Sequence, residues 1–305
     1  MKDAAQIYPQ PKYVFVQGEV ETKFAKKFLS KSKIIAFNCT GSSEEVYNFF
    51  MAHLDDLQEV YESLIDEESK KTFRGYWLGK SSGQLARIVN SDMPQYILSG
   101  FIPKAGDVVI DCGACDGNTA VRFVNLGCKV YAFEMDRINF QLASAIAEKF
   151  EFVVENFGLG FFKHEMTYTH DRQNIGASRL DLNGNEKTQI ITLDSYVGEK
   201  KLPHVDFIKM DVEGAELDIL KGATTTIARF KPILAFSAYH KLDDFWTLMN
   251  FVKSIRPDYE FAMRQYGSSR EDVPFIFRDG QEEFFDSYGL DVRISSFAEC
   301  VLFAR

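Results

Sequence analysis

Apolar side chains recur at helical spacing in the first third of the chain. Between residues 44 and 64 they stand three or four positions apart, at Val46, Phe49, Phe50, Leu54, Leu57, Val60, Tyr61 and Leu64. This spacing predicts a helix with one apolar face, with acidic residues on the other face. A short strand at residues 34–37 is expected before it, and a second helix from Asp66 to about Leu78.

Beyond residue 104 the pattern changes to short apolar segments that alternate with amphipathic helices. This alternation predicts a doubly wound, Rossmann-like α/β fold, with a mainly parallel sheet between two layers of helices. The expected strands lie at residues 108–112, 129–134, 152–157, 207–211, 232–237, 259–265 and 298–304. We therefore divide the chain into a mainly helical N-terminal module, residues 1–104, and an α/β domain, residues 105–305.

Composition narrows the choice of partners. The 305 residues carry a formal net charge of −9, whereas nucleic acid is bound through clustered Lys and Arg. The apolar runs are too short to span a bilayer, the N-terminal residues lack the pattern of a secretory signal, and five scattered cysteines form no disulfide framework. We expect a cytoplasmic protein with a small-molecule substrate and neither a nucleic-acid nor a membrane partner. The sequence does not indicate the oligomeric state.

A glycine-containing turn follows the first strand of the α/β domain. Asp111 ends the strand, and Gly113, Ala114, Cys115 and Gly117 lead into the next helix. Glycine lets the backbone approach a ligand, and a helix N-terminus offers free N–H groups. Asp111 suits a cationic ammonium, as in the methionine part of S-adenosylmethionine, but would repel a pyrophosphate. The dinucleotide fingerprint is also incomplete, because its middle glycine is missing.

Further candidate cofactor contacts follow the second and third strands. Glu134 stands where a carboxylate hydrogen-bonds ribose hydroxyls in nucleotide-binding folds. Met135 is a candidate for packing on adenine, and Asn156 and Gly158 are candidates for lining the adenine pocket. Each position also has an ordinary explanation, since a carboxylate at a strand end can cap a helix and a loop residue need not contact a ligand.

Cys112 and Cys115 also form the Cys-x-x-Cys pattern typical of thiol oxidoreductases. Acidic neighbours, Asp111 and Asp116, raise thiol pKa values, whereas such enzymes need them lowered. No second cysteine pair completes a zinc site. We therefore favour a cofactor-binding turn over a redox site.

Four segments resemble the FkbM family of methyltransferases: Asp-Cys-Gly-Ala-Cys-Asp-Gly at 111–117, Phe-Glu-Met-Asp at 133–136, Ile-Thr-Leu-Asp-Ser-Tyr at 191–196 and Asp-Phe-Ile-Lys-Met-Asp-Val-Glu-Gly-Ala-Glu at 206–216. The resemblance spans about residues 95–265 and resumes at 299–304. It implies a seven-stranded sheet with an antiparallel last strand, S-adenosylmethionine as methyl donor, and usually O-methylation of sugars or polyketide-type natural products. Cys115 departs from the asparagine or tyrosine of the family.

O-methylation requires a base beside the acceptor hydroxyl, because a hydroxyl is a poor nucleophile until it loses its proton. A doubly wound sheet places such groups at the carboxyl ends of its strands. Asp211, Glu213 and Glu216 follow the fourth strand, and His240 follows the fifth. We expect His240 or Glu213 to be the base, Asp211 to orient cofactor or substrate, and Glu216 to stabilise a helix start. A divalent metal ion at His240 is the less favoured hypothesis, and we assign no metal ligand.

Two other function classes stay open. One is a non-catalytic binding or assembly module on a methyltransferase fold, and the other is a nucleotide-sugar or NAD enzyme. The missing middle glycine disfavours the second class. Residues 1–104 are candidates for substrate selection or a lid, and residues 95–96 and 174–178 are candidates for covering the cofactor. The acceptor is not identified by any residue.

Overall fold

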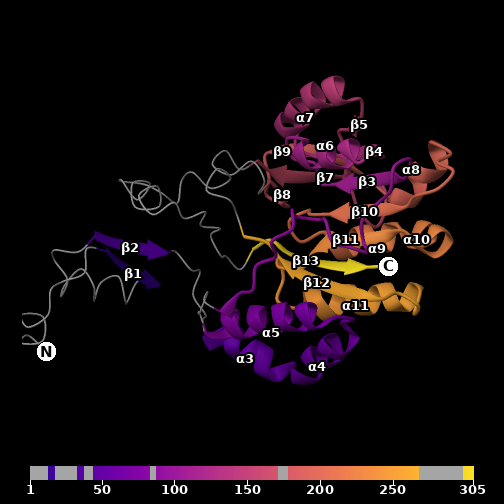
Figure 1. Cartoon of the computed structure of the whole chain (residues 1–305). Coiled ribbons are helices and arrows are strands. Elements are labelled where there is room, and N and C mark those ends of the chain that lie inside the picture. Colours follow the sequence, from indigo (N-terminus) through magenta and orange to yellow (C-terminus); the bar gives the residue numbers. More distant parts are fainter. Residues whose placement is uncertain (1–12, 18–32, 38–43, 83–86, 171–177, 268–297) are drawn as a thin grey trace, which may run out of the picture.

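A sheet of seven strands forms the centre of the structure (Figure 1). This computed structural model describes residues 13–17, 33–37, 44–82, 87–170, 178–267 and 298–305. The strand order is β12–β13–β11–β10–β3–β4–β5. The strands are β3 (Val108–Cys112), β4 (Lys129–Phe133), β5 (Val153–Glu155), β10 (Phe207–Met210), β11 (Ile233–Ser237), β12 (Phe261–Gln265) and β13 (Cys300–Ala304).

The strand directions confirm the predicted fold class. Strands β11, β10, β3, β4 and β5 pair in parallel, and β13 runs antiparallel to both β11 and β12. Parallel strands covered on both faces consist of nearly continuous apolar residues, which is why these strands were visible in the sequence. In β3, Val108 and Ile110 join the hydrophobic core on one face of the sheet, whereas Val109 joins the core on the other face.

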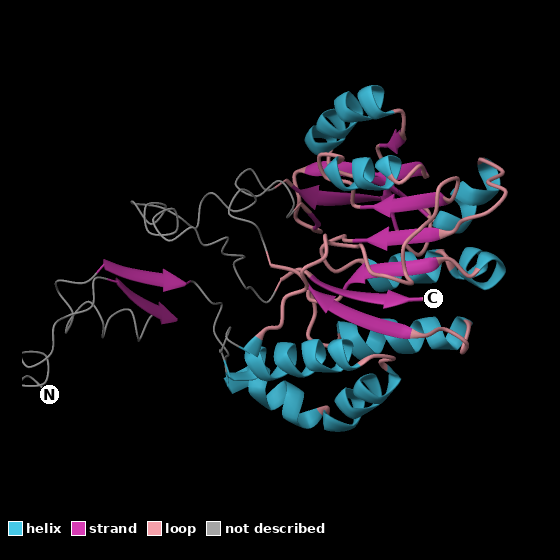
Figure 2. Ribbon diagram, in the orientation of Figure 1, coloured by secondary structure: helices cyan, strands magenta, loops and turns pink. Residues whose placement is uncertain are grey.

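Helices cover both faces of this sheet (Figure 2). On the Val109 face lie α6 (Asn118–Asn125) and α7 (Arg137–Phe150). On the other face lie α8 (Leu193–Glu199), α9 (Glu216–Gly222), α10 (Thr224–Phe230) and α11 (Asp244–Ile255). Within the described ranges, no helix has the length and apolarity needed to cross a bilayer.

The N-terminal helices extend the same core. The segment expected to be one helix is two, α3 (Glu44–Ala52) and α4 (Leu54–Ser63), and α5 (Glu67–Ser82) follows. The break falls at His53, whose ring stacks on Phe49 and Trp246. Phe73 of α5 packs edge-on against Phe245 of α11. Residue 104 therefore marks a change in sequence pattern and not a gap in packing.

Two smaller sheets complete the described residues. Strand β1 (Tyr13–Gln17), which was not predicted, pairs in parallel with β2 (Lys33–Phe37). Between β5 and α8 the chain forms a sheet in the order β6–β9–β7–β8. Its strands, β6 (Gly158–Leu159), β7 (His164–Thr169), β8 (Arg179–Leu180) and β9 (Glu186–Ile191), were also missed. β7, β8 and β9 carry many polar, partly exposed side chains, and β6 has only two residues, so none of them shows the apolar runs of the central strands.

Candidate active site

The glycine turn after β3 rests on a buried ion pair. In the parallel register, Lys209 of β10 lies opposite Asp111 of β3, and Nζ is 2.9 Å from Oδ1. Nζ also donates a hydrogen bond to the carbonyl oxygen of Gly113 at 2.6 Å. Burial opposes the charge on Lys209, but attraction to Asp111 outweighs it and raises the lysine pKa above its ordinary value. The pair therefore fixes the turn to the neighbouring strand.

This ion pair bears on the expected role of Asp111, which stays a prediction. Its side chain is 0% exposed and is paired with Lys209, and it does not line the cavity described below. The sequence did contain a signal for the pair. Lysine is almost never fully buried without a partner, and Lys209 stands in the middle of an apolar strand.

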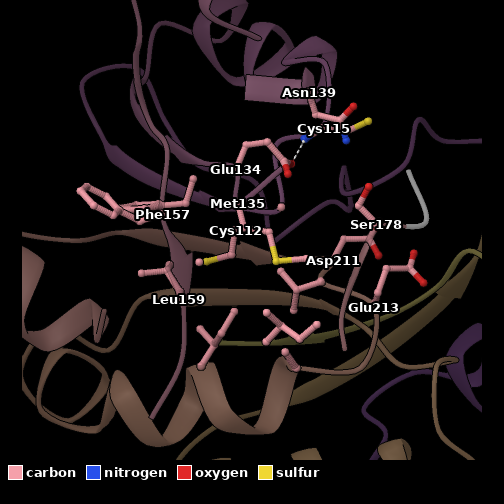
Figure 3. A pocket seen from close by; sticks show the side chains of 17 residues that line it. Cys112, Cys115, Glu134, Met135, Asn139, Phe157, Leu159, Ser178, Asp211 and Glu213 are labelled. Atoms are coloured by element: carbon pink, nitrogen blue, oxygen red, sulfur yellow. Dashed lines mark hydrogen bonds between the residues drawn. The ribbon is translucent and has the colours of Figure 1, made fainter. Parts of the chain in front are cut away.

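A cavity of about 570 Å³, partly open to solvent, lies at the carboxyl ends of β3, β4 and β10 (Figure 3). Of the predicted cofactor residues, Gly113, Cys115, Glu134, Met135 and Gly158 line it. Much of the remaining wall is apolar and was not predicted, including Phe133, Phe157, Leu159, Leu180, Val212 and Ile219.

Three further predicted contacts, Ala114, Gly117 and Asn156, support the cavity without lining it. Ala114 is buried, and its N–H donates to the carbonyl oxygen of Phe133. Gly117 precedes α6 with a φ of 89° and faces the backbone of α7. The Asn156 amide donates to the carbonyl oxygen of Glu134 at 2.8 Å. The direct cofactor contacts expected of these residues stay predictions, and the structure shows contacts that support the cavity wall.

Gly113 is required by close approach of two strand ends. Its φ is +81°, and a Cβ there would lie 2.0 Å from the carbonyl oxygen of Asp211. No side chain fits at that distance, and the left-handed backbone disfavours any residue other than glycine.

Glu134 offers hydrogen-bond acceptors to the cavity. Its Oε2 accepts from the N–H of Cys115 at 2.7 Å (Figure 3). Its Oε1 accepts from the N–H of Asp136 at 2.8 Å. Each carboxylate oxygen has a further lone pair, so the group can also accept from two hydroxyls of a ligand. Burial raises the pKa of Glu134 to about 7. The acceptor positions suit the ribose diol of an adenosine.

The two cysteines of the turn are poor thiolates. Burial, with the charges of Asp116 and Glu134, raises the pKa of Cys115 to about 12. Burial also raises the pKa of Cys112. Reactive thiols have lowered pKa values, so the structure gives no support to a redox site.

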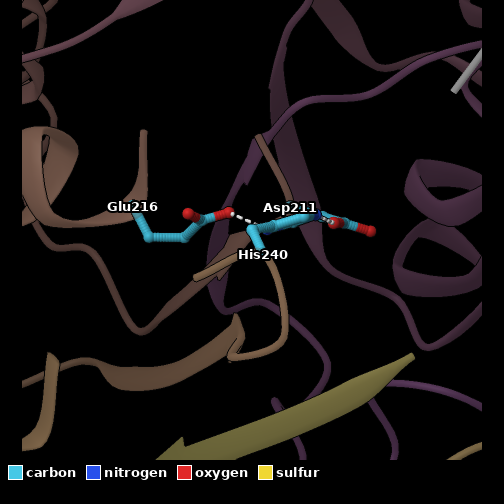
Figure 4. A group of neighbouring side chains, drawn as sticks. All are labelled: Asp211, Glu216 and His240. Atoms are coloured by element: carbon cyan, nitrogen blue, oxygen red, sulfur yellow. Dashed lines mark ion pairs between the residues drawn. The ribbon is translucent and has the colours of Figure 1, made fainter. Parts of the chain in front are cut away.

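A cluster of acidic groups surrounds His240 beside the cavity (Figure 4). Its Nε2 is 3.6 Å from Oδ1 of Asp211 and 3.6 Å from Oε1 of Glu213, and its Nδ1 is 2.9 Å from Oε1 of Glu216. Asp211 and Glu213 line the cavity, whereas His240 does not. Burial lowers the pKa of His240, but the surrounding carboxylates outweigh it and raise it to about 10. As long as no other cation binds beside it, His240 is therefore protonated at neutral pH.

Groups from distant parts of the chain hold Asp211 in place. Tyr96, before the first central strand, donates from its hydroxyl to Oδ2 of Asp211 at 2.7 Å. Tyr239 donates to Oδ1 at 3.4 Å. Gln95 donates to Glu299, beside β13. Residues 95–96 were expected to cover the cofactor, and the structure brings them to the acidic side of the cavity.

Strained backbone gathers at this site. Seven described residues other than glycine have a left-handed φ. Three of them, Glu151, Lys201 and Lys231, follow helix ends, where this conformation is usual. The other four are Tyr96 (φ 63°), Cys115 (50°), Glu213 (54°) and Glu299 (62°). Such strain persists where surrounding structure enforces it, and it clusters at active sites.

The expected lid at residues 174–178 is described only at Ser178. The first four of its residues lie outside the described ranges. Ser178 lines the cavity and donates to Oδ2 of Asp136 at 2.9 Å. Asp136 in turn caps the N-terminus of α7, accepting from the N–H groups of Ile138 and Asn139.

A sequence comparison bears on the function classes. Residues 111–269 match the methyltransferase FkbM domain. The chain belongs to the FkbM methyltransferase family. The predicted family is thereby confirmed and the protein is a methyltransferase, which speaks further against an NAD or nucleotide-sugar enzyme. A comparison with curated proteins gives no match.

Of the solved structures similar to this FkbM family member, the first named here shares its fold. The methyltransferase FkbM of Methylobacillus flagellatus KT is 19% identical, with a TM-score of 0.68, over 94% of this chain and 70% of that one. A precorrin-6Y C5,15-methyltransferase of Geobacter metallireducens GS-15 is 12% identical with a TM-score of 0.41, over 71% and 93%. A putative methyltransferase of Streptococcus mutans, in complex with SAH, is 14% identical with a TM-score of 0.36, over 70% and 97%. At these identities the likeness shows the fold alone, and the last two scores are too low for further argument.

Proposed function

We propose that this methyltransferase transfers a methyl group from S-adenosylmethionine to a hydroxyl of a small molecule, such as a sugar or another natural product. One observation carries the proposal. Glu134, which suits the donor's ribose, lines the same cavity as the carboxylates Asp211 and Glu213, which suit the reacting end. The donor's ribose and its reacting end would therefore both face this one cavity.

The residues present fit the donor. Apolar side chains such as Phe157 and Leu159 offer a surface for adenine. Gly113 permits close approach of the backbone, and Glu134 accepts from the ribose hydroxyls. Asp211 replaces Asp111 as the acid that orients the methionine end, because it lines the cavity and Asp111 does not.

Glu213 is the better of the two candidate bases. Its side chain is 30% exposed and lines the cavity, whereas His240 is paired with carboxylates that favour its protonated form. When bound, S-adenosylmethionine supplies an electrophilic methyl group on a sulfonium. Glu213 would accept the proton of the acceptor hydroxyl and so make its oxygen a better nucleophile toward that methyl group, and the donor would depart as S-adenosylhomocysteine. Positioning supplies much of the acceleration in such a transfer.

Ligand binding and turnover test the proposal separately. S-adenosylhomocysteine at about a hundred times its Kd should stabilise the fold by about 2.7 kcal/mol, and NAD should not. Glu213→Gln should reduce the turnover of hydroxyl acceptors by about 10²–10⁴-fold and leave S-adenosylhomocysteine affinity nearly unchanged. The exposed Glu165→Gln is the matched control. Stabilisation by NAD alone would contradict the donor, and wild-type turnover in Glu213→Gln would contradict the base. Binding without turnover on hydroxyl acceptors would instead favour a binding module.

Affinity for S-adenosylhomocysteine should rise with pH. Glu134 titrates with a pKa of about 7 because it is buried. Ribose hydroxyls donate to its ionised form, so protonation below that pKa weakens binding. About one-tenth of the sites are ionised at pH 6 and about nine-tenths at pH 8, which predicts a Kd roughly tenfold lower at pH 8. Calorimetric titration measures this difference. The same pH dependence in Glu134→Gln would show that another group titrates.

A further inference from the structure

Negatively charged groups surround one imidazole ring at the edge of the cavity. Three carboxylates, of Asp211, Glu213 and Glu216, lie within 3.6 Å of the His240 ring nitrogens. The imidazole and the carboxylates come from separate elements: Asp211 follows β10, Glu216 begins α9 and His240 follows β11. Asp211, Glu216 and His240 each offer one ligand atom, and these atoms lie within 4.8 Å of one another. Together they form a mixed oxygen and nitrogen donor set.

Buried atoms in this set lack hydrogen-bond partners. The side chain of His240 is only 8% exposed, and its Nε2 has no hydrogen bond within the described part of the chain, since the nearest carboxylate oxygens lie 3.6 Å away. Glu216 is 1% exposed, and its Oε2 also lacks a hydrogen-bond partner among the described residues. Buried polar atoms normally have partners, and an unsatisfied set indicates a missing water or ion. Figure 4 shows the carboxylates of Glu216 and Asp211 directed toward opposite sides of the His240 ring.

We propose that Asp211 and Nε2 of His240 bind a divalent metal ion, with Glu216 holding the ring from its Nδ1 side. Two ligand atoms that each lie about 2.1–2.2 Å from one ion are about 3.0–3.7 Å apart when the ligand–ion–ligand angle is between about 90° and about 120°. The distance of 3.6 Å between Nε2 and Oδ1 of Asp211 fits this range. Metal-binding histidines almost always donate their second ring N–H to a carboxylate or carbonyl. Glu216, at 2.9 Å from Nδ1, stands in that position.

The metal ion would add a catalytic group to the proposed function. Only this catalytic role rests on the proposed function. Held by Asp211 and His240 beside the cavity, a divalent ion would supply Lewis acidity that lowers the pKa of an acceptor hydroxyl. Glu213 then removes a more acidic proton. Metal binding itself requires neither donor nor acceptor.

Manganese is a suitable probe, because carboxylate sites accept it readily. The full chain, stripped with EDTA and dialysed, is titrated with MnCl₂ by calorimetry and by the electron paramagnetic resonance signal of free Mn²⁺. We expect one ion per chain. His240→Ala and Asp211→Asn should each weaken Mn²⁺ binding at least tenfold, and Glu216→Gln by about 10–100-fold. The control variant Glu165→Gln changes an exposed acidic residue on β7 and should bind Mn²⁺ as the wild type does.

Each outcome decides the proposal. Circular dichroism identifies any variant that fails to fold, and the two remaining substitutions then carry the comparison. Absence of Mn²⁺ binding at millimolar concentration, or equal affinity in wild type and all folded variants, overturns the site. Mn²⁺ binding that the variants lose, without methyl transfer to hydroxyls, supports the site and contradicts the proposed function. Full turnover in EDTA without Mn²⁺ binding overturns the site and leaves the proposed function standing.

Discussion

Replacing Lys209 with methionine should lower the free energy of unfolding by about 3–5 kcal/mol, because it leaves the carboxylate of Asp111 buried without its cation. Both side chains are almost fully buried, 2% exposed for Lys209 and 0% for Asp111. Methionine has a similar length and fills the same space, so the loss reports charge and not volume. The variant also loses the hydrogen bond to the Gly113 carbonyl. Chemical denaturation monitored by circular dichroism measures the change.

A second substitution separates the ion pair from other effects of Lys209. In the Lys209→Met background, Asp111→Asn removes the buried charge and should recover much of the lost stability. Lys187→Met breaks an exposed pair with Glu165 and serves as the matched control, with little expected change. If the double variant is as unstable as Lys209→Met alone, the buried charge of Asp111 is not the cause.

The central sheet was predictable because its strands are buried on both faces. Strands such as β3 and β10 consist of residues that are all buried, so their apolar runs stand out from the helices between them. The same rule explains the strands that were missed. β9 alternates exposed and buried positions and carries Glu186, Lys187 and Gln189. Such strands are specified by pairing with their neighbours, which a local pattern does not contain.

The residues of the candidate site also differ in whether the sequence alone could predict their roles. Gly113 and Glu134 follow strand ends, so position along the chain was enough to select them. The role of Asp111 depended on the register that sets Lys209 opposite it, and the register is a property of the folded sheet. Tyr96 and Glu299 reach Asp211 and Gln95 from segments over a hundred residues away. Their left-handed backbone is equally invisible in a sequence pattern.

Replacing Gly113 with alanine should destabilise the protein and weaken cofactor binding together. A left-handed φ costs an alanine about 1–2 kcal/mol. The new Cβ would also lie 2.0 Å from the carbonyl oxygen of Asp211, which forces the turn and the end of β10 apart. Overpacking of this kind costs a further 1–3 kcal/mol or so. Because Asp211 and the turn both line the cavity, S-adenosylhomocysteine affinity should fall as well.

Gly106→Ala provides the matched control. Gly106 has a φ of +92°, close to the +81° of Gly113, but a Cβ there would meet nothing within 4 Å. Both variants therefore carry similar backbone strain, and only Gly113→Ala carries the clash. Denaturation should show a larger loss of stability for Gly113→Ala, and calorimetry should show weaker S-adenosylhomocysteine binding for that variant alone. Equal losses of stability with unchanged affinity would mean that the approach of Asp211 to the turn does not shape the cofactor site.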